Sequence, residues 1–368
     1  MKIAFIGGRD IHQIGGIENY MFNLCGKLVE MGHEPIVYCE SNINKKEMLN
    51  GISVIYWKSP KSYYLCKTYL SIKSTLNALF FQKKVQYFHY NAVGPGWACW
   101  IPQLFGRKVL LMGHGLEWKR PRYTYIQKIM IKFLYYISIH IIKNFVMVSQ
   151  EQTDYFLSVY KKKCITIPTA VNLPKIKNIR TPIIDKYGLE NNSFFLYLGR
   201  LIQDKNPDYL IKAFIKAKLN NKKLVIAGSN DLMPKYVEYL HKLAEGYPDI
   251  IFTGNVYGED KEALLSNCLG FCIVSTLEGL SISLLEAMSY GKPIIASDIE
   301  ANKEGLKENG IYVKCEDVDD LCDKLQYFCN NVESLSISSA KNIERIKQYF
   351  TWDIVAKKYI DYLYSIRK

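Results

Sequence analysis

Residues 278–291 read EGLSISLLEAMSYG, a serine-containing turn that leads into an apolar helical run and ends in glycine. A helix that begins near Ser281 would direct most of its apolar side chains toward a core, and Gly291 suits the position just after a helix. Two glutamates, Glu278 and Glu286, flank the start of this helix. The stretch therefore predicts a helix that packs along one face and carries carboxylates near its beginning.

Outward from this stretch, the chain alternates short apolar runs with helical patterns. KIAFI at 2–6 is followed by a glycine-bearing loop, a helical pattern and the run PIVYCE, which is the order of a parallel βαβ unit. A second cycle begins with FFLYLGRL at 194–201, and the runs KLVIAG and DIIFTG follow it after further helical stretches. Prolines and lysines in 171–182 indicate an exposed linker between the cycles. The sequence predicts an α/β protein with two repeats.

The composition is that of an ordered globular protein with a positive charge. Hydrophobic residues make up 49% of the 368 residues, which supports two cores, and the length favours two domains. The formal net charge is +13, with lysines spread along the chain, and this favours anionic partners. No RNP-type or zinc-finger pattern occurs, so we do not expect nucleic acid as a partner.

The cysteines and the N-terminus bear on location. Ten cysteines occur at irregular intervals without a CxxC pair, and the opening run MKIAFIGG is too short for a signal-peptide core. We therefore expect reduced thiols and a cytoplasmic protein.

The start of the helix near Ser281 has the chemistry of an anion site. The amides of Ser281, Ile282 and Ser283 would lack partners within the helix, and the positive end of the helix dipole adds to them, which suits a diphosphate. Glu286 could accept two hydrogen bonds from a vicinal diol such as a ribose, and Glu278 could reach hydroxyls beyond the phosphates. The alternative is that Ser281 caps the helix and both glutamates are solvated.

Two cations follow the first strand of the second repeat. Arg200 and Lys205 lie in GRLIQDKNPDYL, at the end of a strand where open α/β sheets bind ligands. Such cations could neutralise a departing diphosphate. The alternative is that both side chains are solvated.

The first repeat offers candidates of a different kind. Gly15 and Gly16 open a helix, where backbone can approach a ligand closely, although a plain tight turn also fits. The loop is neither a GxGxxG nor a P-loop sequence, which disfavours dinucleotide binding and NTP hydrolysis. His114 follows a strand between two glycines, and Glu117 begins a polar and aromatic loop, EWKR, that could contact a sugar.

With these residues in place, the chain resembles a retaining glycosyltransferase of family 4 over essentially its whole length. The resemblance is carried by GGIENYMFNLCGKLVEMGHE, by GRLIQDKNPDYLIKAF with its GR-x4-K pattern, and by EGLSISLLEAMSYGKPIIASD with its E-x7-E pattern. It implies a GT-B fold, in which two Rossmann-like α/β domains face each other across a donor-binding cleft. The implied parts are an acceptor-side domain at 1–175, a nucleotide-sugar-binding domain at 176–345 and a helix at 346–368 that crosses back to the first domain.

The resemblance also implies roles for individual residues. The implied catalytic residues are His114, Arg200, Lys205 and Glu278. The implied substrate-binding residues are Gly15, Gly16, Glu117, Asn255, Val256, Ser281, Ile282, Ser283 and Glu286. Among these the two cations would hold the diphosphate, Glu286 the ribose, and Asn255 and Val256 the base, with no metal and no cofactor required. Ser281 departs from the family pattern, because a second glycine is common at this position.

A narrower likeness, through residues 88–120 and the stretch at 278–291, is to bacterial rhamnosyltransferases of capsule assembly, and it suggests dTDP-rhamnose as the donor. The alternatives are transfer from a UDP-hexose or a UDP-N-acetylhexosamine. The expected acceptor is a glycan, carried on a lipid diphosphate at the inner membrane face. Residues 60–84 and 123–145 mix lysine with aromatic and aliphatic residues as interfacial helices do, which suggests peripheral contact with an anionic membrane. Ordinary core packing with solvated lysines is the alternative.

Two rival classes remain at this point. Tyr69 and Lys73 form a YxxxK pattern of oxidoreductases, but the dinucleotide fingerprint is missing. The other rival is a non-catalytic protein that binds a nucleotide sugar. The presence of the full set of charged candidate residues disfavours this alternative.

Overall fold

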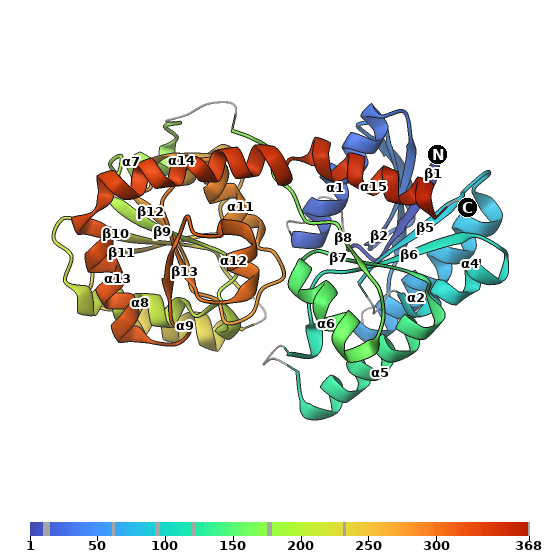
Figure 1. Ribbon diagram of the computed structural model, residues 1–368, viewed down its shortest axis with the longest axis horizontal. Helices are drawn as coiled ribbons and strands as arrows, with labels where there is room; N and C mark the ends of the chain where they lie inside the picture. Colours follow the sequence, from blue (N-terminus) through green and yellow to red (C-terminus); the bar gives the residue numbers. More distant parts are fainter. Residues whose placement is uncertain are drawn as a thin grey trace. The chain divides into compact units, whose positions relative to one another are not determined.

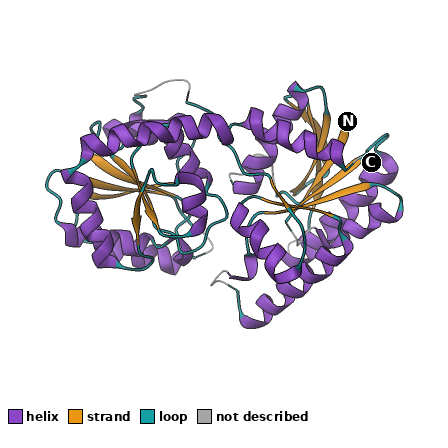
Figure 2. Cartoon of the chain, in the orientation of Figure 1, coloured by secondary structure: helices purple, strands orange, loops and turns teal. Residues whose placement is uncertain are grey.

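The computed structural model describes residues 1–9, 15–60, 63–92, 96–119, 123–174, 179–230 and 233–366, and the chain forms two compact units. Unit 1 comprises Met1–Ala170 and Trp352–Lys368, and unit 2 comprises Val171–Thr351. The sequence placed these divisions at 175/176 and 345/346. In each unit a mainly parallel sheet lies between layers of helices (Figure 2), which confirms the predicted α/β class.

Unit 1 is built on an eight-stranded sheet with the order β3-β4-β2-β1-β5-β6-β7-β8. β3 pairs with β4 in the antiparallel sense, and the other described pairings are parallel. The strands are β1 (Lys2–Ile6), β2 (Glu34–Ser41), β3 (Lys45–Leu49), β4 (Ile52–Lys58), β5 (Tyr87–Asn91), β6 (Lys108–Gly113), β7 (Asn144–Met147) and β8 (Ile165–Thr166).

Both faces of this sheet are buried, as expected for parallel strands. Alternate residues of β1 enter opposite cores: Ile3 and Phe5 face one core, and Ala4 and Ile6 face the other. Two helices cover the first face and lie side by side in Figure 1: α1 (Gly16–Glu30) and α15 (Trp352–Ser365). The remaining helices are α2 (Tyr63–Leu76), the π-helical turn η1 (Asn77–Phe81), the 3-10 turns η2 (Trp97–Cys99) and η3 (Glu117–Lys119), α4 (Trp100–Leu104), α5 (Tyr125–Ile141) and α6 (Gln150–Tyr160).

Unit 2 is built on a six-stranded parallel sheet with the order β11-β10-β9-β12-β13-β14. The strands are β9 (Phe194–Leu198), β10 (Lys223–Ala227), β11 (Ile250–Gly254), β12 (Gly270–Ile273), β13 (Ile294–Ser297) and β14 (Ile311–Val313). The helices are α7 (Pro182–Lys186), the 3-10 turn η4 (Gln203–Lys205), α8 (Pro207–Ala217), α9 (Pro234–Leu243), α10 (Gly258–Asn267), α11 (Ile282–Ser289), α12 (Glu300–Leu306), α13 (Val318–Asn330) and α14 (Val332–Tyr349). One core packs α10 and α11 against the sheet, and the other packs α8, α9 and α13.

The acidic run before α13 has a structural role. The carboxylate of Asp317 accepts hydrogen bonds from the amides of Asp319, at 3.1 Å, and Asp320, at 3.0 Å. These amides are the unpaired donors of a helix start, so Asp317 is a capping residue.

The C-terminal helical region is interrupted, although the sequence suggests a continuous helix over 346–368. α14 ends at Tyr349, and α15 begins at Trp352. Between them the main chain pairs with Val171, whose amide donates to the carbonyl of Phe350 at 2.9 Å, and Thr351 forms a parallel bridge with the same residue. Phe350 packs in unit 2, whereas α15 packs in unit 1. The interruption follows from this pairing with a distant part of the chain.

Candidate active site

The strand order of unit 2 fixes where a ligand site would form. Chain order runs outward from β9 in both directions, through β10 and β11 on one side and through β12, β13 and β14 on the other. The order reverses between β9 and β12, and open parallel sheets bind ligands beyond the carboxyl ends of strands at such a point. The loops that leave these two strands contain Lys205 and Glu278.

Hydrogen bonds join these two loops. The amide of Thr276 donates to the carbonyl of Asp204 at 3.1 Å, and the side-chain amide of Asn206 donates to the carbonyl of Val274 at 3.0 Å. Lys205, between the two bonded residues, forms an ion pair with Glu278, and the exposed fractions of the two side chains are 17% and 8%. The structure thus brings together two residues that the sequence proposed separately, and Lys205 is not simply solvated.

The start of α11 lies just beyond this pair. Ser281 precedes the helix, and its carbonyl accepts the first intrahelical bond from Leu285 at 3.2 Å. Its side chain makes no capping bond; the hydroxyl lies 3.0 Å from that of Ser283. Ser281 thus occupies the N-cap position, but the alternative in which its side chain caps the helix is wrong. The amides of Ile282 and Ser283 stand in the first turn, where the helix supplies no acceptor for them.

Glu286 sits one turn inside α11 and is also paired. Nζ of Lys261, from the first half of α10, donates to its carboxylate at 2.6 Å, and the exposed fractions of these side chains are 30% for the lysine and 18% for the glutamate. Since Glu278 and Glu286 each form an ion pair, the alternative of two solvated glutamates is wrong as well. Sequence reasoning missed Lys261, because nothing in its local pattern points to a residue on another helix.

Arg200 lies beyond β9 and is exposed. Its carbonyl accepts a 3.0 Å hydrogen bond from the hydroxyl of Tyr197, whose ring is buried in the core. Burial raises the pKa of the Tyr197 phenol well above its ordinary value, and the charge of Glu278 raises it further while Arg200 lowers it. Opposite charges from both sequence-predicted residues therefore act on the same phenol.

The residues predicted to meet the base lie beyond β11. Asn255 is exposed, whereas the side chain of Val256 is buried in the core of unit 2. Any contact between Val256 and a ligand would therefore be made by its main-chain atoms. Lys261 follows these two residues on α10.

In unit 1, Gly15 and Gly16 stand at the start of α1. Gly15 has φ −141° and ψ 164°, extended values that any residue can adopt, so conformation does not explain the glycine. A Cβ at Gly15 would lie 2.2 Å from Oε2 of Glu18, a buried carboxylate whose other oxygen accepts from the amide of Arg9 at 3.1 Å. A side chain at position 15 would therefore require the carboxylate of Glu18 to move. Glu18 was not foreseen from the sequence.

His114 follows β6 and is half-buried. Its Nε2 lies 3.3 Å from Oδ1 of Asn91, which also lies 3.1 Å from Nε2 of His89, and Nδ1 of His89 lies 2.8 Å from the hydroxyl of Tyr359. Burial lowers the pKa of His114 to about 4 and that of His89 to about 3. Both imidazoles are therefore neutral at pH 7, and His114 can donate or accept a hydrogen bond but carries no charge.

The loop after His114 only partly matches its expected role. The ring of Trp118 is buried and packs edge-on against Tyr135 at a centroid distance of 4.6 Å. Trp118 is therefore a core residue and not a sugar-contacting ring. The side chain of Glu117 and all of Arg120 lie outside the described part of the chain.

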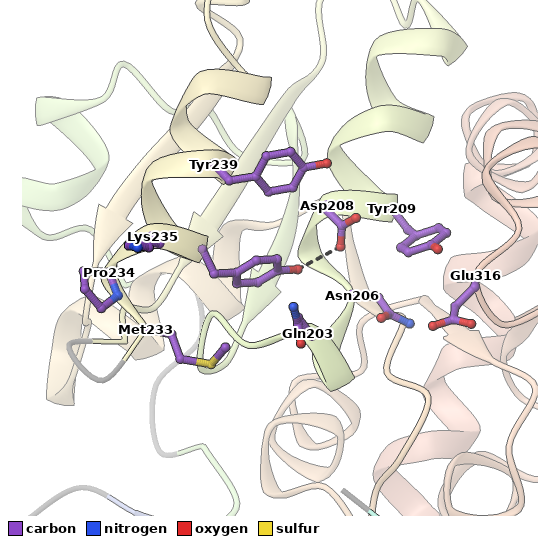
Figure 3. Close-up of a pocket in the computed structure, with 10 residues that line it drawn as sticks. Gln203, Asn206, Asp208, Tyr209, Met233, Pro234, Lys235, Tyr239 and Glu316 are labelled. Carbon is purple, nitrogen blue, oxygen red and sulfur yellow. Dashed lines mark hydrogen bonds between the residues drawn. The ribbon is translucent and has the colours of Figure 1, made fainter. Parts of the chain in front are cut away.

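A hollow of about 870 Å³ lies next to η4 in unit 2 (Figure 3). Gln203 and Asn206 from the Lys205 loop line it together with tyrosines of α8 and α9, and the hydroxyl of Tyr236 donates to Asp208 at 2.8 Å. Among the described residues that line this hollow, none is a sequence-predicted residue, and Lys235 is the one cation. A diphosphate needs several donors, so the better candidate for it is the start of α11 with its paired lysines, despite the size of the hollow.

Comparison with known proteins identifies the class. The fold matches sucrose-phosphate synthase from Thermosynechococcus elongatus with a TM-score of 0.86 at 17% identity, over 99% of this chain and 98% of that one. It matches Anabaena HepE, solved in complex with UDP, with a TM-score of 0.77 at 16% identity, over 99% of this chain and all of the other. These likenesses show the fold alone: the protein is a GT-B protein with two Rossmann-like units.

The families follow from the sequence of each half. Residues 14–175 match the model of Glycosyltransferase Family 4, and residues 180–346 match that of Glycosyl transferases group 1. The chain therefore belongs to the GT-B glycosyltransferases of group 1 and family 4. A Campylobacter jejuni relative, N,N'-diacetylbacillosaminyl-diphospho-undecaprenol alpha-1,3-N-acetylgalactosaminyltransferase, is 25% identical over 63% of each chain. The alignments span between 45% and 63% of the length of the curated relatives that match first.

Proposed function

We propose that the protein is a retaining, metal-independent glycosyltransferase that moves a hexosyl-type sugar from a nucleotide diphosphate to a glycan acceptor in bacterial surface polysaccharide synthesis. The observation that carries this proposal is the pair of lysine-bound carboxylates around the start of α11, at the point where the strand order of unit 2 reverses. In this proposal the lysines and the first-turn amides of α11 donate to the diphosphate, and the carboxylates on either side accept from sugar hydroxyls.

Binding of the donor would exchange partners within this site. The diphosphate would take the ammonium of Lys205, and the carboxylate of Glu278 would then be released to accept a hydrogen bond from the donor sugar. Glu286 would hold the ribose, with Lys261 keeping its carboxylate in place. In this exchange Lys205 stays paired with an anion, and the carboxylate of Glu278 stays hydrogen-bonded, which reduces the cost of keeping it largely buried.

In the transfer step, the bond between C1 of the sugar and the phosphate oxygen breaks, and C1 forms a bond to the acceptor oxygen on the same face. The acceptor proton goes to the departing phosphate oxygen. Negative charge builds on the diphosphate, where Lys205, Arg200 and the first amides of α11 stabilise it. His114, neutral at pH 7, would contribute a hydrogen bond to the sugar and no charge.

The acceptor we propose is a glycan on a lipid diphosphate. The name of the Campylobacter relative, which contains diphospho-undecaprenol, supports this class of acceptor. For the donor, dTDP-rhamnose is the proposal that follows from the sequence likeness, and a UDP-hexose or UDP-N-acetylhexosamine is the alternative.

Thermal shift measurements with a panel of dTDP-, UDP- and GDP-sugars would identify the donor, and NMR of the anomeric proton in the product would show whether configuration is retained. Stabilisation by one nucleotide series followed by transfer with retention is the expected result. Binding without transfer to any acceptor and without donor hydrolysis would favour a non-catalytic nucleotide-sugar-binding protein.

A further inference from the structure

The net charge of the protein resides in one part of unit 1. Residues 48–150 contain fourteen lysines and arginines and a single acidic residue, Glu117, so this segment has a formal net charge of +13, equal to that of the whole chain. The remainder of the chain is neutral overall. This segment includes α2, α4 and α5. A positive field is therefore concentrated on one part of one unit.

The helix α5 within this segment has two apolar faces. Its inner face packs through Tyr135 and Ile139, which are buried in the core of unit 1. Figure 1 shows α5 at the lower margin of that unit. Its outer face presents large apolar side chains at helical spacing, namely Ile126, Ile129, Phe133 and Ile137, which are 70%, 50%, 61% and 38% exposed. The outer face of a surface helix is normally polar, so an apolar outer face indicates a surface that binds a partner.

Basic residues lie at the edge and at the end of α5. Lys132 is exposed at the edge of the apolar outer face, an exposed Lys143 follows the helix, and residues 118–150 contain no acidic side chain. Lys128 lies on the side of the helix that carries Tyr135 and Ile139. A second exposed apolar cluster occurs in the same positive segment, where the rings of Phe80 and Phe105 meet edge-on at 5.3 Å. Among the described residues, no helix is both long enough and apolar enough to cross a bilayer.

We propose that the outer face of α5 docks on an anionic lipid bilayer, with its apolar side chains entering the interface and the exposed Lys132 and Lys143 contacting the headgroups. Exposed apolar residues flanked by lysines, without acidic neighbours, are the pattern of helices that lie in the plane of a membrane surface. Each basic residue near an anionic leaflet adds to the attraction, and the whole positive segment acts in the same direction.

Other partners fit this surface less well. Nucleic acid would engage the lysines but would leave isoleucines of the outer face without an apolar partner. A second copy of the chain, joined through the same face, would bring two segments of +13 together, and their repulsion opposes association. The bilayer is the partner that matches both the charge and the apolar surface.

This inference goes beyond the proposed transfer reaction and does not depend on it, because the residues belong to unit 1 and the paired carboxylates to unit 2. A failure of one can therefore be distinguished from a failure of the other by measuring nucleotide binding and vesicle binding on the same samples.

Vesicle flotation of the full chain tests the proposal. Vesicles of phosphatidylglycerol mixed with phosphatidylcholine should carry the protein at low salt, and vesicles of phosphatidylcholine alone should carry much less. Raising the salt should weaken the binding to the mixed vesicles, because exposed charges are screened.

Two variants separate the contributions of the face. Lys132→Glu with Lys143→Glu should reduce partition to the anionic vesicles by at least about tenfold, since two attractions become repulsions. Ile129→Gln with Phe133→Gln should reduce it as well and keeps good helix formers in the helix. The matched control is Ile337→Gln with Lys341→Glu on α14, a comparably exposed pair in unit 2, and it should bind as the parent does.

Circular dichroism and nucleotide binding would establish that each variant is folded. The proposal would be overturned by a parent protein that does not float with anionic vesicles at low salt. It would also be overturned if both folded α5 variants bound vesicles like the control. Loss of self-association, rather than of vesicle binding, in the α5 variants would assign the face to a second copy, and selective loss of RNA binding would assign it to nucleic acid.

Discussion

Both units place the start of a helix beside the carboxyl end of a central parallel strand, where β1 leads toward α1 in unit 1 and β12 leads toward α11 in unit 2. The side chains around these two helix starts differ. At α11, carboxylates are paired with lysines from neighbouring elements. In the first turn of α1, the buried carboxylate of Glu18 accepts a hydrogen bond from a backbone amide. The ring of His114, whose centroid lies 5.5 Å from that of Tyr20 in α1, is neutral.

The difference supports the proposal that the two units have different roles in the reaction. The backbone amides at a helix start can bind an anion in either unit. The side chains around the helix start determine how much negative charge can be neutralised there. Unit 2 has the lysines that a departing diphosphate requires. Unit 1 has a carboxylate held by a backbone amide and a neutral histidine near its helix start, and it concentrates its positive charge in another segment. We therefore propose that unit 2 binds the donor and that unit 1 forms the acceptor side.

The largest expected effect comes from removing the cation at the junction of β9 and β12. Lys205→Ala should lower kcat by about 10- to 100-fold, because it removes a charge-assisted bond to a group that gains charge in the transition state. It should also lower the free energy of unfolding by about 2 kcal/mol, since the largely buried carboxylate of Glu278 loses its partner. Steady-state kinetics and urea unfolding provide the two measurements.

Lys216→Ala is the matched control, because Lys216 pairs with Asp319 on the surface of the same unit with both side chains more than half exposed. An exposed pair of this kind contributes less than about 1 kcal/mol and should leave kcat unchanged. Equal effects of the two substitutions would remove the distinction between the site and the surface.

A smaller effect is expected one turn into α11. Glu286→Ala should weaken nucleotide binding by about tenfold with a small change in stability, because it removes the acceptor proposed for the ribose hydroxyls. Titration calorimetry with the nucleoside diphosphate measures it. Lys261→Ala, which leaves the carboxylate in place, should weaken binding less than Glu286→Ala. Unaltered affinity in the Glu286 variant would count against the assignment of this unit to the donor.

The smallest effect at neutral pH concerns the neutral histidines of unit 1. The pKa of His89 is lowered to about 3 by burial, so below its ordinary value of about 6.5 the unfolded chain takes up a proton that the native chain does not. The free energy of unfolding should therefore fall as the pH decreases, by up to about 1.4 kcal/mol per pH unit for this histidine. His89→Gln should show a shallower decrease between about pH 6 and pH 4. Identical slopes would show that His89 is protonated in the native state.

Much of the fold follows from local patterns. Strands such as β9 are apolar throughout because both faces of the sheet are buried, and α11 ends where Gly291 adopts φ 65°. The interruption between α14 and α15 could not be predicted, because it depends on main-chain pairing with Val171, far away in the sequence. Local propensity carries no information about such a partner.

The site could be predicted only in part for a related reason. The spacing of Glu278 and Glu286 marks both carboxylates, but whether they are solvated depends on Lys205 and Lys261, which come from other elements. The burial of Trp118 was likewise invisible in a polar stretch of sequence. The uneven distribution of net charge was also missed, because the lysines themselves are spread along the whole chain. The positive charge of residues 48–150 arises instead because this segment has almost no acidic residues.

The most direct test is a crystal structure of the protein with its donor or with the nucleoside diphosphate. The account predicts phosphate oxygens within about 3 Å of the amides of Ile282 or Ser283, Lys205 turned from Glu278 to the diphosphate, and the ribose on Glu286. A nucleotide bound elsewhere, with the ion pair between Lys205 and Glu278 intact and the start of α11 uncontacted, would contradict it.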